Sequence, residues 1–266
     1  MRFLSITYSQ NPTGMPSHYH EGHEILFVTA GKIRVTVEGQ EYIAGPGDLV
    51  LLSRFEEHAM QVLTPQYQRY ALQLGHEPSV YTAEDPVLSS VLVNRGGSFR
   101  HVVSTGESFP AFEEIFRQML RESTHRAPMW ESQLALLLQA LLILLYRQVP
   151  MLFVTDSSRM AAMVNQLRNC MEERFQQKMS LEALAREYHV SASHLAHSFR
   201  QITGYAPMEY LTACRLSAAK QYLSTTALPV QEIVDLCGFG DESNFSRLFR
   251  RKTGLTPTEF RKKYRL

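Results

Sequence analysis

The chain has 266 residues, of which 44% are hydrophobic and 20% are charged, and its formal net charge is +1. This length allows one to three domains with a sizeable apolar core. The charge is uneven: residues 1–155 hold 11 Lys and Arg against 15 Asp and Glu, whereas residues 156–266 hold 16 against 11. This balance argues against polyanion binding by the front of the chain and favours it at the back.

The cysteines and the apolar segments exclude further classes of protein. Cys170, Cys214 and Cys237 are odd in number and widely spaced, which argues against a disulfide framework or a zinc cluster. The first residues lack the apolar stretch of a signal peptide. The run Leu134–Leu145 covers only about twelve residues, too few to span a bilayer. We therefore expect a cytoplasmic protein that does not enter a membrane.

Short alternating segments fill the front of the chain. Ile33, Val35 and Val37 alternate with polar residues, and Gly45–Asp48 interrupts the pattern. This spacing predicts a small antiparallel barrel or sandwich over about residues 1–80. The other expected strands are Tyr42–Ile43, Leu49–Leu52, Met60–Leu63 and Tyr67–Leu74.

Three histidines and one carboxylate accompany these strands, namely His18, His20, Glu24 and His58. On a continuous strand, His18, His20 and Glu24 would point to one face, because side chains alternate with a period of two. Such a set can hold a divalent metal. It can equally line a polar pocket or form structural hydrogen bonds, and the residues alone leave all three interpretations open.

A helical hairpin is expected over about residues 108–148. A short helix over Pro86–Val93 precedes it, within an otherwise uninformative stretch. Ser108 caps the first helix of the hairpin, and Pro128 fits the first turn of the second, which runs to about Gln148. The first helix has an apolar face made of Phe112, Ile115, Phe116, Met119 and Leu120.

The second helix of this hairpin is apolar on both sides. A helix of this kind must be covered on more than one side. It either packs between the barrel and its neighbouring helix or forms the contact between two copies of the chain. We favour the contact between copies, because a short hairpin offers little else to cover so many leucines. One side carries Leu134, Leu137, Leu138, Leu141, Leu142 and Leu145, and the other Ala135, Leu136, Ala140, Ile143 and Leu144.

The back of the chain reads as helices. Residues 1–150 form the first expected domain, residues 151–158 a linker, and residues 159–266 a second domain that begins with a helix over Arg159–Gln176. Ser180 and Ser191 are the expected caps of the next two helices, which begin at Leu181 and just after Ser191. A connecting helix over Pro207–Ser224 would be about 27 Å long at 1.5 Å per residue.

The tail contains a second pair of helices around a tight turn. Apolar residues from Val230 to Leu236 fall at helical spacing, the run stops at Gly238, and Asp241 supplies an N-cap. This is a helix-turn-helix pattern, whose second helix enters a DNA major groove. The apolar face of that helix is Phe245, Leu248 and Phe249. From Ser243 on, the sequence has a single acid, Glu259, and many basic residues, a composition suited to phosphate binding. The basic residues are Arg247, Arg250, Arg251, Lys252, Arg261, Lys262, Lys263 and Arg265.

An internal repeat strengthens this interpretation, because two copies of one unit explain it better than coincidence does. Upstream, the turn of the first copy is one residue shorter than that of the second. A shift of about fifty positions places Ser193 on Ser243, Leu195 on Phe245, Phe199-Arg200 on Phe249-Arg250, Thr203-Gly204 on Thr253-Gly254, Pro207 on Pro257, Glu209 on Glu259 and Tyr210 on Phe260.

The stretch GFGDESNFSRLFRRKTGLTPTEFR, residues 238–261, resembles the signature of the AraC/XylS family of bacterial transcription regulators. The resemblance covers about the last hundred residues. It implies an α+β chain, with a cupin-like barrel and helical hairpin followed by an all-α DNA-binding domain. In that domain, a long helix joins two helix-turn-helix units at about residues 180–204 and 229–254.

The same resemblance implies which residues contact DNA. Arg247 can bind guanine through O6 and N7, Asn244 can pair with adenine, and Glu242 can accept a hydrogen bond from cytosine. The implied base contacts are Ser193, Ala196 and His197 in the first unit and Glu242, Ser243, Asn244 and Arg247 in the second. By helix geometry, His194 also faces the groove, and the expected phosphate contacts are Arg200, Arg250, Arg251 and Lys252.

The pattern His18-x-His20-x3-Glu24, with Pro46-Gly47-Asp48 and His58, resembles the two cupin motifs. The first motif lacks its glycine at the usual distance, and the second lacks its terminal asparagine. Many AraC-type sensor domains keep this opening without a metal. We therefore expect His18, His20, Glu24 and His58 to line an effector site, with no metal and no cofactor.

The resemblance implies a non-enzymatic transcription regulator, expected to be an activator. It implies a small-molecule effector, a homodimer formed through the 108–148 helices, and contact with RNA polymerase. Sugars are common effectors in the family, and aromatic or peptide-like ligands stay open. The alternative is a metal-dependent cupin enzyme fused to a DNA-binding tail. No second catalytic group accompanies the histidines, so we disfavour it.

Overall fold

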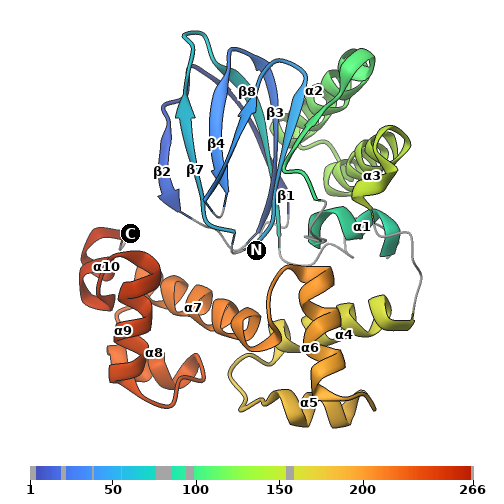
Figure 1. Ribbon diagram of the computed structural model, residues 1–266. Helices are drawn as coiled ribbons and strands as arrows, with labels where there is room; N and C mark the ends of the chain where they lie inside the picture. Colours follow the sequence, from blue (N-terminus) through green and yellow to red (C-terminus); the bar gives the residue numbers. More distant parts are fainter. Residues whose placement is uncertain are drawn as a thin grey trace. The chain divides into compact units, whose positions relative to one another are not determined.

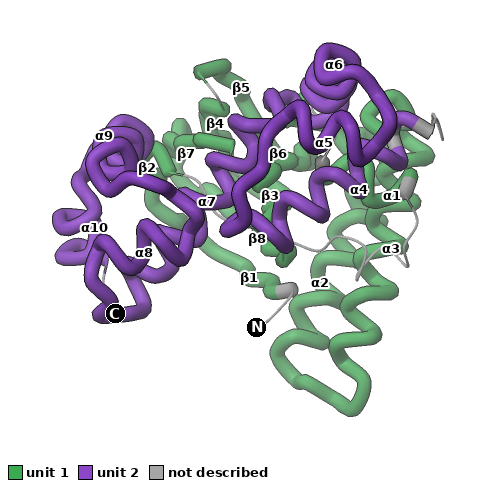
Figure 2. Tube along the Cα trace, turned by 90° about the horizontal axis from the view of Figure 1, so that it is seen from below, with its two compact units in different colours: residues 1–94, 98–155 green, residues 95–97, 156–266 purple. Residues whose placement is uncertain are grey.

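The computed structural model describes residues 4–18, 22–37, 39–54, 56–75, 86–93, 99–153 and 159–264 (Figure 1). The chain divides into two compact units, whose described parts lie within 4–153 and 159–264 (Figure 2). The first unit combines β-sheets with helices, and the second is helical in all its regular elements described here. The prediction of an α+β chain is confirmed.

The first unit is an antiparallel sandwich of two sheets within the described residues. Ile33, Val35 and Val37 are buried as their alternation predicts. One sheet has the order β1 (Leu4–Gln10), β8 (Gln68–Leu74), β3 (His23–Ala30), β6 (Asp48–Leu52) and β9 (Val102–Ser104). The other has the order β2 (Met15–His18), β7 (His58–Val62), β4 (Ile33–Val37) and β5 (Gln40–Ala44).

The five-stranded sheet separates two apolar cores, because its central strands are buried on both faces. In β3, Leu26 and Val28 face the core between the sheets, whereas Ile25 and Phe27 face the helices. The helix side is covered by α1 (Pro86–Val93), α2 (Phe109–His125) and α3 (Trp130–Gln148) (Figure 1).

The hairpin differs in detail from its prediction. Ser108 occupies the N-cap position of α2, but its hydroxyl makes no capping hydrogen bond. Pro128 lies before α3 rather than in its first turn, because Met129 adopts a left-handed conformation with φ 67°. Leu152 and Phe153 were expected in the linker but are buried in the apolar core, and residues 154–158 lie outside the described part.

The second unit begins with α4 (Arg159–Glu173), which ends three residues earlier than expected. Arg215 explains this end, since its guanidinium donates to the carbonyls of Phe175 and Gln177 at 2.7 and 2.8 Å and holds that turn. The other helices are α5 (Leu181–Glu187), α6 (Ala192–Thr203), α7 (Pro207–Thr225), α8 (Val230–Leu236), α9 (Glu242–Thr253) and α10 (Pro257–Tyr264).

The repeat seen in the sequence returns as repeated hydrogen bonds. The hydroxyls of Thr203 and Thr253 donate to the carbonyls of Phe199 and Phe249 at 2.7 and 2.8 Å. Left-handed glycines then end α6 and α9. In the next helices, Glu209 and Glu259 accept from backbone N–H groups three residues earlier, at 3.1 and 2.7 Å. Two copies of one unit are therefore present.

The turns of the two copies also match. The N–H of Val190 donates to the carbonyl of Ala185 at 3.0 Å, and the N–H of Phe239 donates to that of Val234 at 2.9 Å. The residue before each donor is left-handed. At Gly238 this conformation requires glycine, because an added Cβ would lie 2.5 Å from the Gln176 carbonyl oxygen.

Candidate DNA-binding and effector sites

The orientation of α6 is fixed by its cap and its buried face. The hydroxyl of Ser191 accepts from the N–H of His194 at 3.2 Å, as the sequence predicts. Leu195 and Phe199 are fully buried. The opposite face is then free to meet a ligand. Its exposed residues are Ser193, His194, His197 and Arg200, with Ala196 half-buried beside them.

The second helix-turn-helix unit presents α9 in the same way. The carboxylate of Asp241 accepts from the N–H of Asn244 at 2.6 Å, which confirms the predicted cap. Phe245 and Phe249 are fully buried. The guanidinium of Arg247 donates to the side-chain oxygen of Asn244. The two strongest candidates for base contacts are therefore hydrogen-bonded to each other on the surface. The exposed set is Glu242, Ser243, Asn244 and Arg247.

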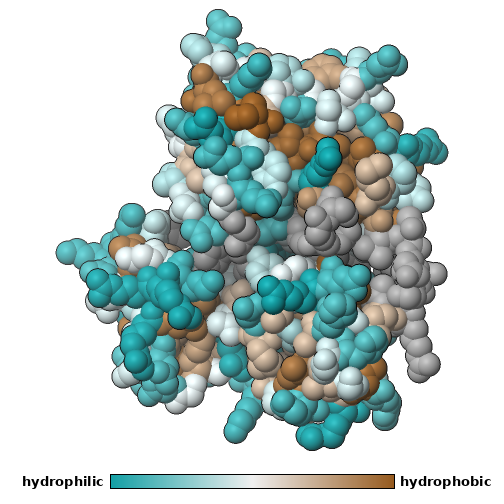
Figure 3. Space-filling model, viewed as in Figure 1, coloured by the Kyte–Doolittle hydropathy of each residue, from teal (hydrophilic) through white to brown (hydrophobic). Residues whose placement is uncertain are grey.

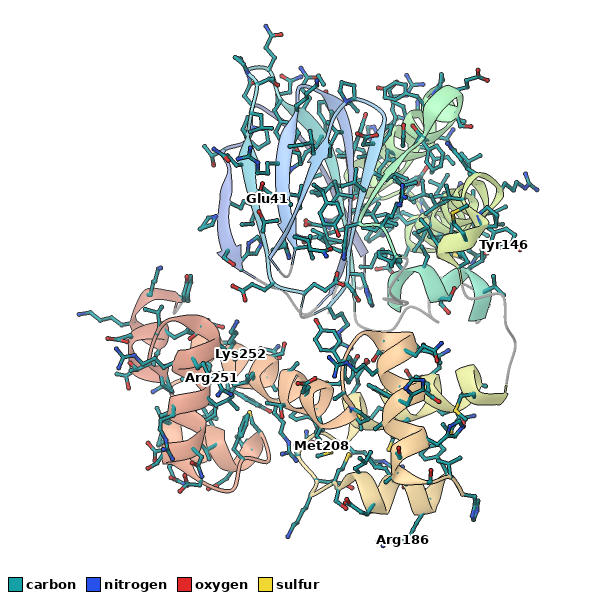
Figure 4. The ribbon with its side chains drawn as sticks, viewed as in Figure 1. Glu41, Tyr146, Arg186, Met208, Arg251 and Lys252 are labelled. Carbon is teal, nitrogen blue, oxygen red and sulfur yellow. The ribbon has the colours of Figure 1, made fainter. Side chains whose placement is uncertain are left out.

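Basic side chains continue from the end of α9. Arg250, Arg251 and Lys252 are exposed in its last turn. Figure 4 labels Arg251 and Lys252 there. The face of this unit around α9 and α10 is largely hydrophilic (Figure 3). Arg261 departs from the expected phosphate-binding set, because its guanidinium donates to the Leu228 carbonyl and packs inside the unit. Arg265 lies outside the described residues.

The two exposed helices lie at opposite ends of α7. They run roughly parallel to each other in Figure 1. Both are seen end on in Figure 2, which is turned by 90° from that view. The connecting helix has 19 residues, one more than expected. At 1.5 Å per residue it is about 28 Å long. This length is close to the roughly 34 Å that separates successive turns of a DNA groove.

The histidines of the sandwich are only partly brought together. His18 and His58 are paired across β2 and β7, with ring centroids 4.3 Å apart. Glu24 is buried in β3 of the other sheet, so the expectation of one continuous strand is wrong. His20 lies outside the described residues. Among the residues that the structure describes, no group of three or more His, Cys, Asp or Glu side chains is placed to hold a metal ion.

Sequence reasoning missed Tyr67 and Arg69, which are buried between the two sheets. Strand parity could have found Arg69, because it alternates with Tyr70 and Leu72, which face the helices. The guanidinium carbon of Arg69 lies 5.9 Å from the Tyr67 ring centroid. Burial raises the pKa of Tyr67, and the positive charge of Arg69 opposes that rise.

Two repeated helix-turn-helix units in one helical unit, together with a cupin-like sandwich, define a class of DNA-binding transcription regulators. Residues 184–263 match the helix-turn-helix domain family, and residues 6–68 match the cupin domain family. The resemblance to the AraC/XylS family is confirmed, because the chain joins an AraC-type helix-turn-helix domain to a cupin domain.

Individual relatives agree with this class. The HTH-type transcriptional activator RhaS of Klebsiella pneumoniae (strain 342) is 26% identical over 274 residues, covering 94% of this chain and 88% of its own length. RhaS of Salmonella arizonae is 27% identical, with coverages of 92% and 87%. These relatives are named as transcriptional activators and not as enzymes, which agrees with the expectation of a regulator.

The fold is shared with ToxT from Vibrio cholerae. One solved structure of ToxT matches with a TM-score of 0.64 at 10% identity, over 99% of both chains. At this identity the match describes the architecture alone. None of the helices described here combines the length and apolar character that crossing a bilayer requires.

Proposed function

We propose that this chain is an effector-controlled transcription activator that places α6 and α9 in successive major-groove segments of one DNA duplex. The observation that carries the proposal is the repeated presentation of two parallel, capped helices on a single connecting helix. A connector of about 28 Å suits two probes on one side of a duplex.

Base recognition is assigned chiefly to α9. Arg247 offers a planar fork for guanine, and Asn244 can pair with adenine. The hydrogen bond between these two side chains has to break before either binds a base, so we expect the two base contacts to form together. In α6, Ser193 and His197 supply polar contacts, while Ala196 can meet a thymine methyl group.

Affinity without sequence preference is assigned to the cationic groups at the helix ends. Arg200, Arg250, Arg251 and Lys252 are exposed and suited to phosphate oxygens. Each phosphate neutralised releases condensed counterions, so binding weakens as salt rises. Tight binding at low salt with a steep salt dependence follows from this composition.

Control by a small molecule is assigned to the sandwich. An effector that binds one arrangement of the chain better than another shifts the balance between them. His18 and His58 supply adjacent polar groups, and Glu24 a buried carboxylate. The relatives are named as activators, which supports that sign of regulation. The solved structures of ToxT include one with a bound unsaturated fatty acid, which supports small-molecule binding by this architecture.

Dimerisation is assigned to the uncovered side of α3. The six leucines of its other side are buried within the first unit, so only the remaining side is available for the expected contact between two copies. Leu136 and Ile143 remain 58% and 39% exposed, with Ala140 between them. In sedimentation, we expect Leu136→Lys with Ile143→Lys to yield monomers, while Ile43→Lys, at an equally exposed strand position, leaves the dimer intact. An unchanged dimer in the double variant would exclude this surface.

The DNA-binding proposal is tested by selecting duplexes from a random pool with the purified full-length chain. Arg247→Ala should lose preference at one base pair of the selected site. Arg121→Ala is the matched control, because it removes an exposed positive charge from α2. Selection of no common sequence, or equal sites for all three proteins, would contradict the assignment. With RNA polymerase in a transcription assay, the wild-type chain should raise output from a promoter carrying the selected site.

A further inference from the structure

Arg69 is the feature of the sandwich that the proposed contacts leave unexplained. It lies in β8 with the parity of Ala71, which belongs to the core between the sheets. Only 9% of its surface is exposed. A positively charged side chain therefore sits in a layer otherwise formed largely by apolar residues.

The guanidinium reaches across to the opposite sheet. Its two terminal nitrogens donate to the sulfurs of Met60 and Met15, at 3.1 and 3.8 Å. Its Nε is buried without a hydrogen-bond partner. Within the described part of the chain, no carboxylate lies at ion-pair distance from this group. Thioether sulfurs are weak acceptors, so the charge is poorly compensated.

The other arginine that is buried among the described residues shows the contrast. Arg168 in α4 is 8% exposed, and its Nε lies 3.5 Å from the carboxylate of Glu172, one helical turn away. Arginine stays protonated in proteins, so burial cannot be relieved by losing the proton. A buried, unpaired charge is costly, and a guanidinium in that state favours a bound anion.

The surroundings of Arg69 narrow the class of anion. The hydroxyl of Tyr67 is buried, and Arg69 is the group that favours its charged form. His58 lies two positions from Met60 on the same strand face, with His18 beside it. Glu24 is a buried carboxylate whose charge also acts on Tyr67. The other buried residues of this core are mostly aliphatic, and methionine side chains can move aside for a ligand.

We propose that Arg69 anchors the carboxylate of the effector, which is a small organic monoanion with an apolar body. The inference rests on the proposed effector control and names its ligand class. A planar carboxylate matches the fork of one guanidinium and balances its single charge. Tyr67 donates to the same carboxylate. A neutral polyol fits less well, because it would leave the buried charge of Arg69 uncompensated.

Thermal unfolding of the full-length chain tests the anchor. The probes are straight-chain carboxylates from acetate to octanoate and benzoate, each compared with its neutral amide and with sodium chloride at equal ionic strength. We expect at least one carboxylate to raise the unfolding midpoint above its amide, because ligands stabilise the state that binds them. The rise should be lost in Arg69→Met and kept in Arg34→Met, whose arginine is half-buried and paired with Glu41.

The unfolding midpoint of Arg69→Met without any carboxylate is a second test. Replacing a buried charge by an apolar side chain of similar length should leave the midpoint without carboxylate unchanged or higher. A lower midpoint with an unchanged carboxylate response would make Arg69 structural and overturn the proposal. Equal effects of carboxylates, amides and chloride on the wild-type chain would also overturn it.

DNA binding separates this inference from the function on which it rests. If a neutral compound alters DNA affinity equally in the wild type and in Arg69→Met, effector control stands and the anionic anchor fails. If a carboxylate stabilises the chain through Arg69 but leaves DNA affinity unchanged, the anchor stands and effector control by this site fails. A carboxylate that does both only when Arg69 is present supports both.

Discussion

The two helix-turn-helix units have the same backbone but different surfaces. Ser191 and Asp241 cap α6 and α9 in the same way, and the turns before them share one hydrogen-bond pattern. On the exposed faces, the assigned base contacts of α6 include Ser193 and His197, whereas those of α9 include Glu242 and Arg247. Packing constrains the buried half of each unit, and the proposed DNA contacts would constrain the exposed half. We therefore assign fine sequence choice to the second unit and positioning to the first.

The shared scaffold is the part whose disruption should have the largest effect. Phe199 packs edge-to-face on Tyr210 at 5.6 Å, and Phe249 on Phe260 at 5.4 Å. Removing a buried phenyl ring costs about 3–5 kcal/mol of stability. Phe199→Ala and Phe249→Ala should therefore destabilise the helical unit to a similar extent in urea unfolding followed by circular dichroism.

The matched control for these two variants is Leu236→Ala, at a side chain that is 39% exposed. It should change stability by only about 0.5 kcal/mol. A loss below about 1 kcal/mol for one phenylalanine alone would show that the two copies are not equivalent in packing.

Base recognition is the point at which the two units should diverge. Arg247→Ala is expected to weaken binding to the selected site by about 1–3 kcal/mol and to relax choice at one base pair. Ser193→Ala should have a smaller effect, because a hydroxyl contact is replaceable by water. Gel shifts with single-base variants of the site measure both. Equal losses for the two variants would contradict the division of roles.

The helix caps offer a finer comparison. Asp241 accepts at 2.6 Å with a carboxylate, whereas Ser191 accepts at 3.2 Å with a hydroxyl. Losing a cap typically costs about 0.5–2 kcal/mol, and bonds to charged groups lie toward the upper end. Asp241→Ala should therefore destabilise more than Ser191→Ala in chemical unfolding. The reverse order would show that the cap of α6 carries more of the stability.

The smallest expected effect concerns pH. The backbone N–H and the hydroxyl of Thr256 donate to Glu259 and lower the pKa of its carboxyl. Its contribution to stability is therefore present above the ordinary carboxyl pKa and is lost as pH falls through the lowered value. Glu259→Gln should be less stable than the wild type at neutral pH, and this difference in stability should become smaller in acid. A gap that widens in acid would refute this role.

The sequence predicted the helical unit far better than the sandwich. Helix caps and apolar spacing are local signals, so Asp241 and Phe249 could be placed without the fold. Strands β1, β2 and β9 were not expected, because they are short or lie at sheet edges and gain their pairing from distant segments.

The candidate sites divide in the same manner. The exposed face of α9 follows from helix geometry, and its residues stay as proposed contacts. The barrel site needed long-range information: only the sheet order places Glu24 and His18 in different sheets, and only strand register turns Arg69 toward Met60. Parity within a strand gives two faces but does not say which face is inside.

Hydroxyl-radical footprinting of the full-length chain on its selected duplex tests the central claim most directly. The account predicts two protected segments on one face of the DNA, about one helical turn apart for each chain bound. Arg247→Ala should weaken protection of one segment, and Ser193→Ala should affect only the other. A single protected segment, two segments on opposite faces, or no protection at low salt would contradict the account.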